Sequence, residues 1–387
     1  MAGLDFFRYG KGAKEGHKLA ALALITLAAT FFFYLPFLAK ADYVIFPAFK
    51  LEKNTFDTIY MHWDGPIYAV VAKTLYDVKE NPFPQLTFYH YSAALIGYPL
   101  AIRALSFAGY LNAMLLASIL FAVLSVLVFY KILKEFKYTD QPFYIAALFA
   151  FIPPRWLIYH SVGAAESMFV FLTLLSFYFY KKDQHAFAAV SGTLAAVTKI
   201  LGVLLFPFFI AMLFLGRKKA DWRSYCMYAL IPLALIAHFL FFQSAFGDFW
   251  IYLKVNAGGV SATPFSTIAS SAALSPAPEF YVGIYAITAL GISRAFKKDK
   301  ALALFALLFF IPALFINLRD VSRYLIPAMP FALLIGFEDI LKSKEFKRIL
   351  PLVIVLVYLY AWTFTAADLD HLMPGEYWTK AMAFFGR

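Results

Sequence analysis

Residues 111–130 read LNAMLLASILFAVLSVLVFY, a run of 20 residues without a charged side chain. An α-helix of this length crosses the hydrocarbon core of a bilayer, so the run predicts a transmembrane helix. The run at 19–39 is long for the core of a signal peptide, and no small-residue cleavage site follows it, so we expect a retained helix there. Similar apolar runs occur along the rest of the chain, at 142–158, 167–181, 186–199, 201–216, 225–243, 281–296, 301–317, 324–341 and 349–367.

These runs predict an all-α polytopic membrane protein, a helical bundle of about 11 transmembrane helices. The composition agrees, because 63% of the 387 residues are hydrophobic and only 15% are charged, against about 25% charged in soluble domains. A soluble globular protein, a disordered chain and a fibrous repeat are therefore excluded. The single cysteine, Cys226, excludes a disulfide framework and a cysteine-based metal cage.

Basic residues gather in loops between the apolar runs. In a soluble protein the net charge of +11 would suggest a nucleic-acid partner, but here membrane orientation explains it, and we expect membrane lipids and no nucleic acid as partners. The clusters are Lys11/Lys14/Lys18, Lys131/Lys134/Lys137, Lys181/Lys182, Arg217/Lys218/Lys219/Arg223, Arg294/Lys297/Lys298/Lys300 and Lys342/Lys344/Lys347/Arg348. The positive-inside rule puts all of them in the cytoplasm, with the N-terminus inside and the C-terminus outside, in a prokaryotic plasma membrane or an ER-like membrane.

This orientation requires that residues 91–108 do not cross the membrane. The segment is short and carries Pro99 and Arg103, so we expect an external helix that lies on the membrane or dips into it. If it did cross, the cluster at 131–137 would fall outside and break the rule.

The external regions are then 40–110, 159–166, 244–280 and the tail 368–387. The segment 244–280 is rich in Gly, Ser, Ala and Pro, which fits a mobile lid or a low-complexity linker equally well. We find no repeat of 20–50 residues and no second soluble domain. The chain is therefore predicted to be one integral-membrane domain, 1–387, with a catalytic loop at 40–110 and a flexible loop at 244–280.

The loop 40–110 holds the most informative carboxylate. Asp64 stands before a Gly-Pro turn that can start a helix. The apolar spacing that follows predicts an amphipathic helix at the membrane face, through Ile67, Val70, Val71, Thr74 and Leu75. Asp64 at its N-terminus can act as a general base on a hydroxyl, or it can simply cap the helix. Spacing alone favours the cap.

Other charges lie in or beside the apolar runs, where they are expensive to desolvate. Glu166 opens a helix at the external side and either caps it or contacts substrate. Lys199 separates two short apolar runs at the same side, where it can bind an anionic headgroup or snorkel to the interface. Two arginines that can grip a phosphate, or pair with Asp320, are Arg319 and Arg323. The remaining charges of this set are Asp57, Arg103 and Arg155.

Several motifs are absent from the sequence. There is no Walker A loop, no dinucleotide-binding glycine turn and no HExxH. His62 and His90 lack a third ligand, so polar loop residues are a better interpretation than a zinc site. We predict no metal site.

Five short motifs lie in order between about residues 55 and 330. They are His62-Trp63-Asp64 with Tyr68 and Ala72, Tyr98-Pro-Leu, Pro154…Ala165-Glu166-Ser167-Met-Phe169, Gly192-Thr-Leu-Ala-Ala-Val-Thr-Lys199…Gly202 and Arg323-Tyr324…Pro327…Pro330. In this order they resemble GPI mannosyltransferase II (PIG-V) and its prokaryotic relatives. In that family the last four motifs read "(Y/F)PL", "P…YSE(S/A)LF", "GLAT..R..G" and a late "RY…P" stretch.

The resemblance implies a GT-C glycosyltransferase that inverts the sugar on transfer. The donor would be a polyprenyl- or dolichyl-phosphate sugar, with mannose expected, and the acceptor a lipid-linked or glycan hydroxyl on the external or luminal face. Asp64 would be the catalytic base, Glu166 would shape the acceptor or donor site, and Lys199 and Arg323 would lie near the lipid phosphate. Lys199 stands where the family usually has Arg.

The remaining candidates for donor or substrate binding are Asp57, His62, Trp63, Tyr68, His90 and Arg319. No cofactor is expected besides the lipid-linked sugar, and no divalent metal is indicated. The alternative function is a lipid or solute transporter without glycosyl transfer. Transporters often contain inverted repeats and midplane charges, whereas this sequence shows no repeat symmetry and concentrates its polar residues in the external stretch 54–68.

Overall fold

The structure is a computed structural model that describes residues 14–215, 222–271, 277–317, 321–367 and 375–386. These residues are predominantly helical, and the only β-pairing among them consists of two isolated bridges, Tyr43 with Lys50 and Val260 with Ile316. The predicted all-α class is confirmed. The chain divides into two compact units, and each is described by itself.

Unit 1 comprises the described parts of 1–29, 122–157 and 259–357. Its principal contacts join α14 to α15, to α13 and to η7, a short π-helical segment. Its helices are α6 (Pro142–Leu148), α13 (Ser266–Ser271), α14 (Ala277–Phe296), α15 (Lys300–Ala313), α16 (Val321–Tyr324), η6 (Ile326–Ala328), η7 (Pro330–Ile335) and α17 (Glu338–Leu341).

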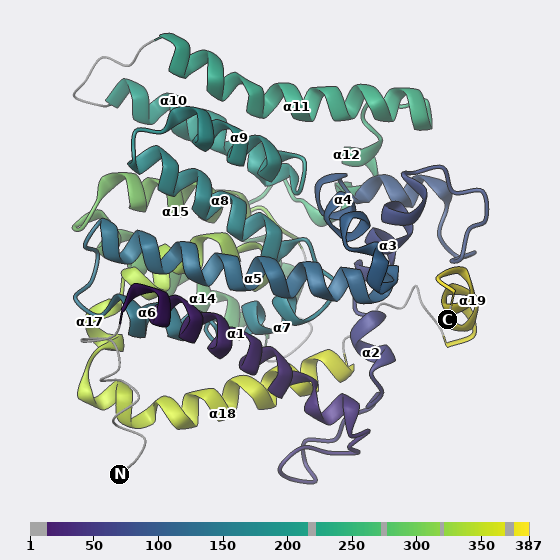
Figure 1. Cartoon of the computed structure of the whole chain (residues 1–387), viewed down its shortest axis with the longest axis horizontal. Helices are drawn as coiled ribbons and strands as arrows, with labels where there is room; N and C mark the ends of the chain where they lie inside the picture. The colour runs from purple at the N-terminus through teal and green to yellow at the C-terminus, as the bar shows by residue number, and fades with distance from the viewer. Residues whose placement is uncertain (1–13, 216–221, 272–276, 318–320, 368–374, 387) are drawn as a thin grey trace. The chain divides into compact units, whose positions relative to one another are not determined.

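Unit 2 comprises the described parts of 30–121, 158–258 and 358–387. Three of its helices, α8, α9 and α11, lie side by side (Figure 1). Its helices are α2 (Asp57–Tyr60), α3 (Gly65–Thr74), η2 (Phe88–Ala93), α4 (Gly97–Ala104), η3 (Ser106–Ala108), α8 (Glu166–Lys181), α9 (His185–Ala196), η4 (Ile200–Leu204), α10 (Leu205–Leu215), α11 (Trp222–Phe246), α12 (Ile251–Asn256) and α19 (Gly375–Phe384). Helices shared between the units are α1 (Glu15–Leu38), α5 (Tyr110–Glu135), α7 (Pro154–Ser161) and α18 (Lys344–Ala367), and η5 (Ala257–Gly259) lies at a boundary.

Four of the described helices are long and apolar enough to span a bilayer, namely α1, α5, α11 and α18. Counting α7 and α8, which are bent by 112°, as one broken span adds a fifth. The predicted runs 186–199, 201–216 and 301–317 form the shorter apolar helices α9, η4 with α10, and α15. A count of about 11 spans therefore requires that shorter helices also cross the membrane, in addition to the four long ones.

Two of the predicted spans do not form continuous helices, so these predictions are wrong. The run 142–158 consists of α6, a break, and the start of α7, because Pro153 and Pro154 follow each other at the break. The run 324–341 is a series of short helical segments from α16 to α17, with turns at 325 and 336–337, and Pro327 and Pro330 stand at the starts of η6 and η7. Proline lacks the N–H that a continuing helix needs, so an apolar run that contains several prolines breaks into pieces.

Residues 91–108 form no spanning helix. The longest helix in the segment, α4, has eight residues and measures about 12 Å, against a hydrocarbon core of about 30 Å. Its length agrees with the prediction that this segment does not cross the membrane.

The segment 244–280 has more structure than a low-complexity linker. It contains α12, η5 and α13, and its middle is paired with the end of α15. In unit 1, Ser261 N donates to Phe315 O at 2.8 Å and Asn317 N donates to Gly259 O at 3.0 Å. The linker interpretation is therefore wrong for residues 259–271, while the lid interpretation stays a prediction.

One end of unit 1 carries a network of charged side chains centred on Glu338. Lys342 Nζ lies 2.7 Å from this carboxylate and Lys298 Nζ lies 3.0 Å from it, and Thr139 Oγ1 donates to it at 2.9 Å. The network joins the basic clusters at 294–300 and 342–348 and reaches the segment directly after 131–137. These three clusters meet at one end, as the positive-inside orientation requires, although the orientation itself stays a prediction.

The network predicts an acid-sensitive contribution to stability. Burial alone would raise the pKa of Glu338, but hydrogen bonds from Lys342, Lys298 and Thr139 outweigh it and hold this pKa below its ordinary value of 4.5. We expect Glu338→Gln to lower the free energy of unfolding by about 1–3 kcal/mol at neutral pH, because two lysines lose a shared partner. The midpoint of thermal unfolding in detergent measures this.

A depressed pKa stabilises the folded state fully above the unfolded pKa, and the stabilisation disappears as the pH falls through the folded pKa. The difference between wild type and Glu338→Gln should therefore be constant above about pH 4.5 and vanish in stronger acid. The exposed Glu345, on the next helix, is the control, and Glu345→Gln should change little. Equal effects of the two substitutions at neutral pH would contradict the role of the network.

Candidate functional site

Asp64 lies at the start of α3, as the sequence predicts, but its surroundings differ from the prediction. It is the N-cap residue of α3 and makes no side-chain cap hydrogen bond, so the capping interpretation is not what the structure favours. The residue is half-buried. Trp63 before it has a φ of +48°, a left-handed conformation that is uncommon for a large side chain and typical of functional turns.

The helix that Asp64 starts is not amphipathic. Every residue from Gly65 to Ala72 is buried, so the prediction of an amphipathic helix at the membrane face is wrong. The second face of the helix, which the pattern predicted to face water, carries Tyr68, Ala69 and Ala72. These side chains are small or aromatic, and they are buried like those of the predicted apolar face. Helix α3 therefore lies within unit 2, where it packs against α4.

Gly65 brings the start of α3 against the turn before α8. A Cβ at this position would lie 3.0 Å from Gly163 O and 3.2 Å from Met114 Sδ, so a larger residue would push the two backbones apart. Gly163 is three residues before Glu166. The backbone of Asp64 is thus held next to the segment that leads into α8.

Tyr98 connects α3 to the same segment. The rings of Tyr68 and Tyr98 meet edge to face with centroids 5.1 Å apart. The Tyr98 hydroxyl lies 2.6 Å from Ser118 Oγ, which accepts a hydrogen bond from Ala164 N at 3.3 Å. Burial raises the pKa of Tyr98, and the nearby charge of Glu166 raises it further, although the hydrogen bond with Ser118 lowers it. This phenol therefore stays protonated close to Glu166.

Glu166 and Lys199 form a buried ion pair. Lys199 Nζ lies 2.6 Å from Glu166 Oε1, and the side chains of Lys199 and Glu166 are 19% and 4% exposed. The sequence predicted both residues as site candidates but treated them separately. Removing either partner of such a pair is strongly destabilising, because the charge that remains loses a close opposite charge in a place with little water.

The lengths of two helices explain how these residues meet. Helix α8 starts at Glu166 and has 16 residues, and α9 returns beside it with 12. At 1.5 Å per residue they measure about 24 Å and about 18 Å, so α9 ends roughly 6 Å short of Glu166. Residues 197–199 follow the end of α9 and span the remaining distance to Glu166. Lys199 has an extended backbone conformation.

A glycine of α4 fixes the break at 197–199. Gly97 N donates to Val197 O at 2.8 Å, and a Cβ on Gly97 would lie only 2.4 Å from Thr198 Oγ1. Only glycine allows this close approach of two backbones. The starts of α3, α4 and α8 and the end of α9 therefore lie together in unit 2, and they carry Asp64, Tyr68, Glu166 and Lys199.

The two histidines have different surroundings. His62 is fully buried, and its ring lies 6.2 Å from Trp63, 6.4 Å from Tyr159 and 6.2 Å from Phe364 between centroids. His62 lies in the turn between α2 and α3, as the loop interpretation predicts, but it is buried within an aromatic cluster. His90 is half-buried in η2, which packs against α12. Among the described residues, no group of three or more His, Cys, Asp or Glu side chains is arranged to hold a metal ion.

The remaining candidates are distributed more widely. Asp57 is the first residue of α2 and is half-buried. Arg323 is buried in α16 of unit 1, and Arg319 and Asp320 lie outside the described residues. Arg103 serves the structure, because its NH1 donates to Ala72 O at 2.9 Å and to Lys73 O at 3.1 Å at the end of α3.

Sequence reasoning gave no role to Gly97 and Tyr98. The signal was available, because Tyr98 begins the Tyr-Pro-Leu segment of the family resemblance and Gly97 directly precedes it. Their partners, Val197 and Ser118, lie far away in the sequence, and spacing cannot reveal such contacts.

Comparison with known proteins shows similarity in structure only. No family model and no curated protein sequence matches the chain. Among solved structures, ArnT from Cupriavidus metallidurans bound to undecaprenyl phosphate aligns with a TM-score of 0.55 at 11% identity, over 88% of this chain and 64% of that one. The oligosaccharyltransferase of Archaeoglobus fulgidus in the apo form aligns with a TM-score of 0.50 at 13% identity, over 89% of this chain and 55% of that one.

The chain spans less than two thirds of the length of either protein. At these identities the similarity concerns the fold, which is that of GT-C membrane glycosyltransferases and agrees with the predicted fold class. With its apolar helices, the chain is an integral membrane protein of the GT-C fold.

Proposed function

We propose that the protein is an inverting glycosyltransferase that transfers a sugar from a polyprenyl- or dolichyl-phosphate donor to a hydroxyl acceptor. The observation that carries the proposal is Asp64 at the start of a buried helix, in a GT-C fold, in the same unit as Lys199, whose ammonium pairs with the buried Glu166. ArnT, which shares the fold, was solved with undecaprenyl phosphate. The sequence resemblance to PIG-V favours mannose as the sugar and a lipid-linked or glycan acceptor.

The proposed step is a single displacement at the anomeric carbon. Asp64 accepts the proton of the acceptor hydroxyl as that oxygen bonds to the anomeric carbon. The bond from this carbon to the phosphate oxygen breaks on the opposite side, and its electron pair leaves with the lipid phosphate. One carboxylate suffices as base, because the phosphate leaves as an anion and needs no strong acid.

Lys199 is proposed to stabilise the charge that grows on the departing phosphate. A fixed cation in a site with little water is effective, because it needs no reorganisation when the charge develops. Glu166 holds the ammonium at its position through the ion pair. Arg323 is a second candidate for the phosphate.

The proposed active site faces the external or luminal side. The meeting of three basic clusters at one end of unit 1 supports an orientation in which that end is cytoplasmic. In unit 2, Lys181 and Lys182 end α8, whereas Glu166 begins it, so the candidate site and this basic pair lie at opposite ends of the helix. The lipid-linked donor would then be used on the face away from nucleotides.

The first test concerns the base. We expect Asp64→Asn to lower the rate of sugar transfer on the order of 10²- to 10⁴-fold, because the amide cannot accept the acceptor's proton. The measurement uses the purified protein in detergent, radiolabelled polyprenyl-phosphate mannose and a panel of lipid and glycan acceptors. Folding is checked by the thermal unfolding midpoint.

The matched control is Asp77→Asn, the same chemical change at an aspartate just beyond α3 whose side chain is 74% exposed. It should leave transfer near the wild-type rate. Lipid flipping or solute uptake that persists in Asp64→Asn, with no sugar transfer by wild type to any acceptor, would favour the transporter instead.

The second test separates the electrostatic role of Lys199 from its structural role. Lys199→Gln should lower stability by about 3–5 kcal/mol, because it removes the ammonium that lies 2.6 Å from the buried carboxylate of Glu166. The double variant Glu166→Gln/Lys199→Gln should recover most of that stability. Sugar transfer should stay on the order of 10²-fold or more below wild type in both variants.

Thermal unfolding and initial transfer rates measure the two effects in parallel. Recovery of both stability and transfer in the double variant would contradict a role for the Lys199 charge in the reaction. Lys199→Arg is the conservative control, and it should retain more transfer than the glutamine variants because the positive charge is kept.

A further inference from the structure

A hairpin follows α1 and stands apart from the candidate site. Residues 41–51, here the aromatic hairpin, are closed by Leu51 N donating to Asp42 O at 2.8 Å and Val44 N donating to Phe49 O at 3.0 Å. Its base is tied by Asn54, whose Nδ2 donates to Lys40 O at 3.1 Å. The segment is therefore a defined turn with a fixed tip.

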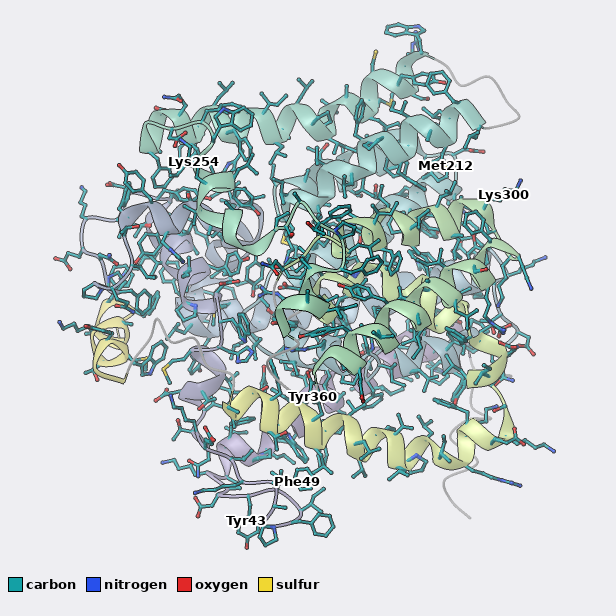
Figure 2. All side chains as sticks on the ribbon, turned by 180° about the vertical axis from the view of Figure 1, so that it is seen from behind. Tyr43, Phe49, Met212, Lys254, Lys300 and Tyr360 are labelled. Atoms are coloured by element: carbon teal, nitrogen blue, oxygen red, sulfur yellow. The ribbon has the colours of Figure 1, made fainter. Side chains whose placement is uncertain are left out.

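The tip exposes large apolar side chains. Tyr43, Ile45 and Phe46 are 56%, 54% and 57% exposed, and the rings of Phe46 and Phe49 lie 6.4 Å apart between centroids. Figure 2 shows the side chains of Tyr43 and Phe49 on this hairpin. A contiguous apolar tip of this kind usually marks an interaction site.

The backbone at the tip gives an independent reason to look for a function. Ile45 has a φ of +63°, a left-handed conformation that glycine or asparagine adopts easily and a β-branched residue does not. A turn selected only for its geometry would favour glycine here. Isoleucine at this position points to a need for its exposed apolar side chain.

The position of the hairpin in the chain identifies the surface that it meets. Helix α1 is one of the spanning candidates and ends at Leu38. Only residues 39–42 separate it from Tyr43, and four residues reach about 14 Å at most. The hairpin therefore stays near the membrane boundary, whichever way it points.

The residues beside the aromatic tip suit that boundary. Lys40, Lys50 and Lys53 are exposed at the base of the hairpin, where long amines can reach lipid phosphates while apolar atoms lie deeper. Tyr and other aromatic side chains are enriched at the same depth in membrane proteins.

We infer that the aromatic hairpin is a membrane anchor that inserts Ile45 and Phe46 into the boundary between headgroups and acyl chains, beside the end of α1. The predicted external catalytic loop 40–110 then has two parts with different partners. Residues 41–51 contact lipid, and the helices from α2 to α4 build the site. This inference does not depend on the reaction catalysed.

The test measures depth with a fluorescent label. The full chain carries Cys226→Ser, which removes the native, exposed cysteine, and Phe46→Cys labelled with an environment-sensitive fluorophore. It is reconstituted in phosphatidylcholine nanodiscs, with or without lipids that carry a quencher near the headgroup. We expect several-fold stronger quenching by the lipid quencher, and several-fold weaker quenching by aqueous iodide, than at the control position.

The control is Lys79→Cys in the same background, in the same predicted external loop and with a side chain that is 84% exposed. Adding Ile45→Asp to the Phe46→Cys protein should raise iodide quenching toward the control, because a charge at the tip opposes insertion. Iodide access at position 46 equal to that at 79 would overturn the inference. Protection from iodide without lipid quenching would also overturn it, since protein and not lipid would then cover the tip.

Discussion

The ion pair between Lys199 and Glu166 is the interaction on which the candidate site depends. Two opposite charges 2.6 Å apart and largely shielded from water are stable only together. Their contact fixes the end of α9 against the start of α8. Gly97 brings the backbone of α4 against residues 197–198, and Gly65 brings the start of α3 against Gly163, before α8. These contacts fix the position of Asp64.

The same pair explains why an anionic leaving group fits the proposed reaction. A lone buried lysine would be strongly destabilising and would shift toward its neutral form. The contact of 2.6 Å with Glu166 holds the ammonium of Lys199 in place, so in the proposed reaction a phosphodiester would meet a cation that is already oriented. In the proposed reaction Glu166 therefore positions Lys199, whereas Asp64 acts on the acceptor. The proposed separation of these tasks between two carboxylates agrees with their surroundings, since Glu166 is almost fully buried and Asp64 is half-buried.

The sequence predicts some of this structure well and some of it not at all. Helices α1, α5, α11 and α18 follow from apolar length alone, because a run of about 20 residues without charge has few other solutions. Apolar length does not report continuity, so the proline-rich runs 142–158 and 324–341 were predicted as spans but form short helices. Their prolines carried the missing information.

The site shows a different limit of sequence reasoning. Asp64, Glu166 and Lys199 were predicted as individual candidates, but periodicity cannot show that Glu166 and Lys199, 33 positions apart, form a pair. Periodicity also misjudged α3, because alanine and tyrosine on its second face are as compatible with a protein interior as with a surface. Tyr98 was quoted only within a motif, since its contacts with Ser118 and Tyr68 arise from tertiary packing.

The aromatic hairpin and the candidate site are connected through α2, and this connection bears on how a lipid-linked substrate is met. Thr58 Oγ1 in α2 donates to Lys53 O at the base of the hairpin, and Tyr60 OH donates to Asn112 of α5 at 2.6 Å. A tip held at the lipid boundary would therefore fix the depth of α2 in the membrane. Asp64 lies four residues after the end of α2. The phosphate of a polyprenyl donor lies at that same boundary, because its chain is in the hydrocarbon and its charge is not. In the proposed reaction, an anchor there would keep the proposed base and the donor phosphate at matching depths while the spanning helices tilt.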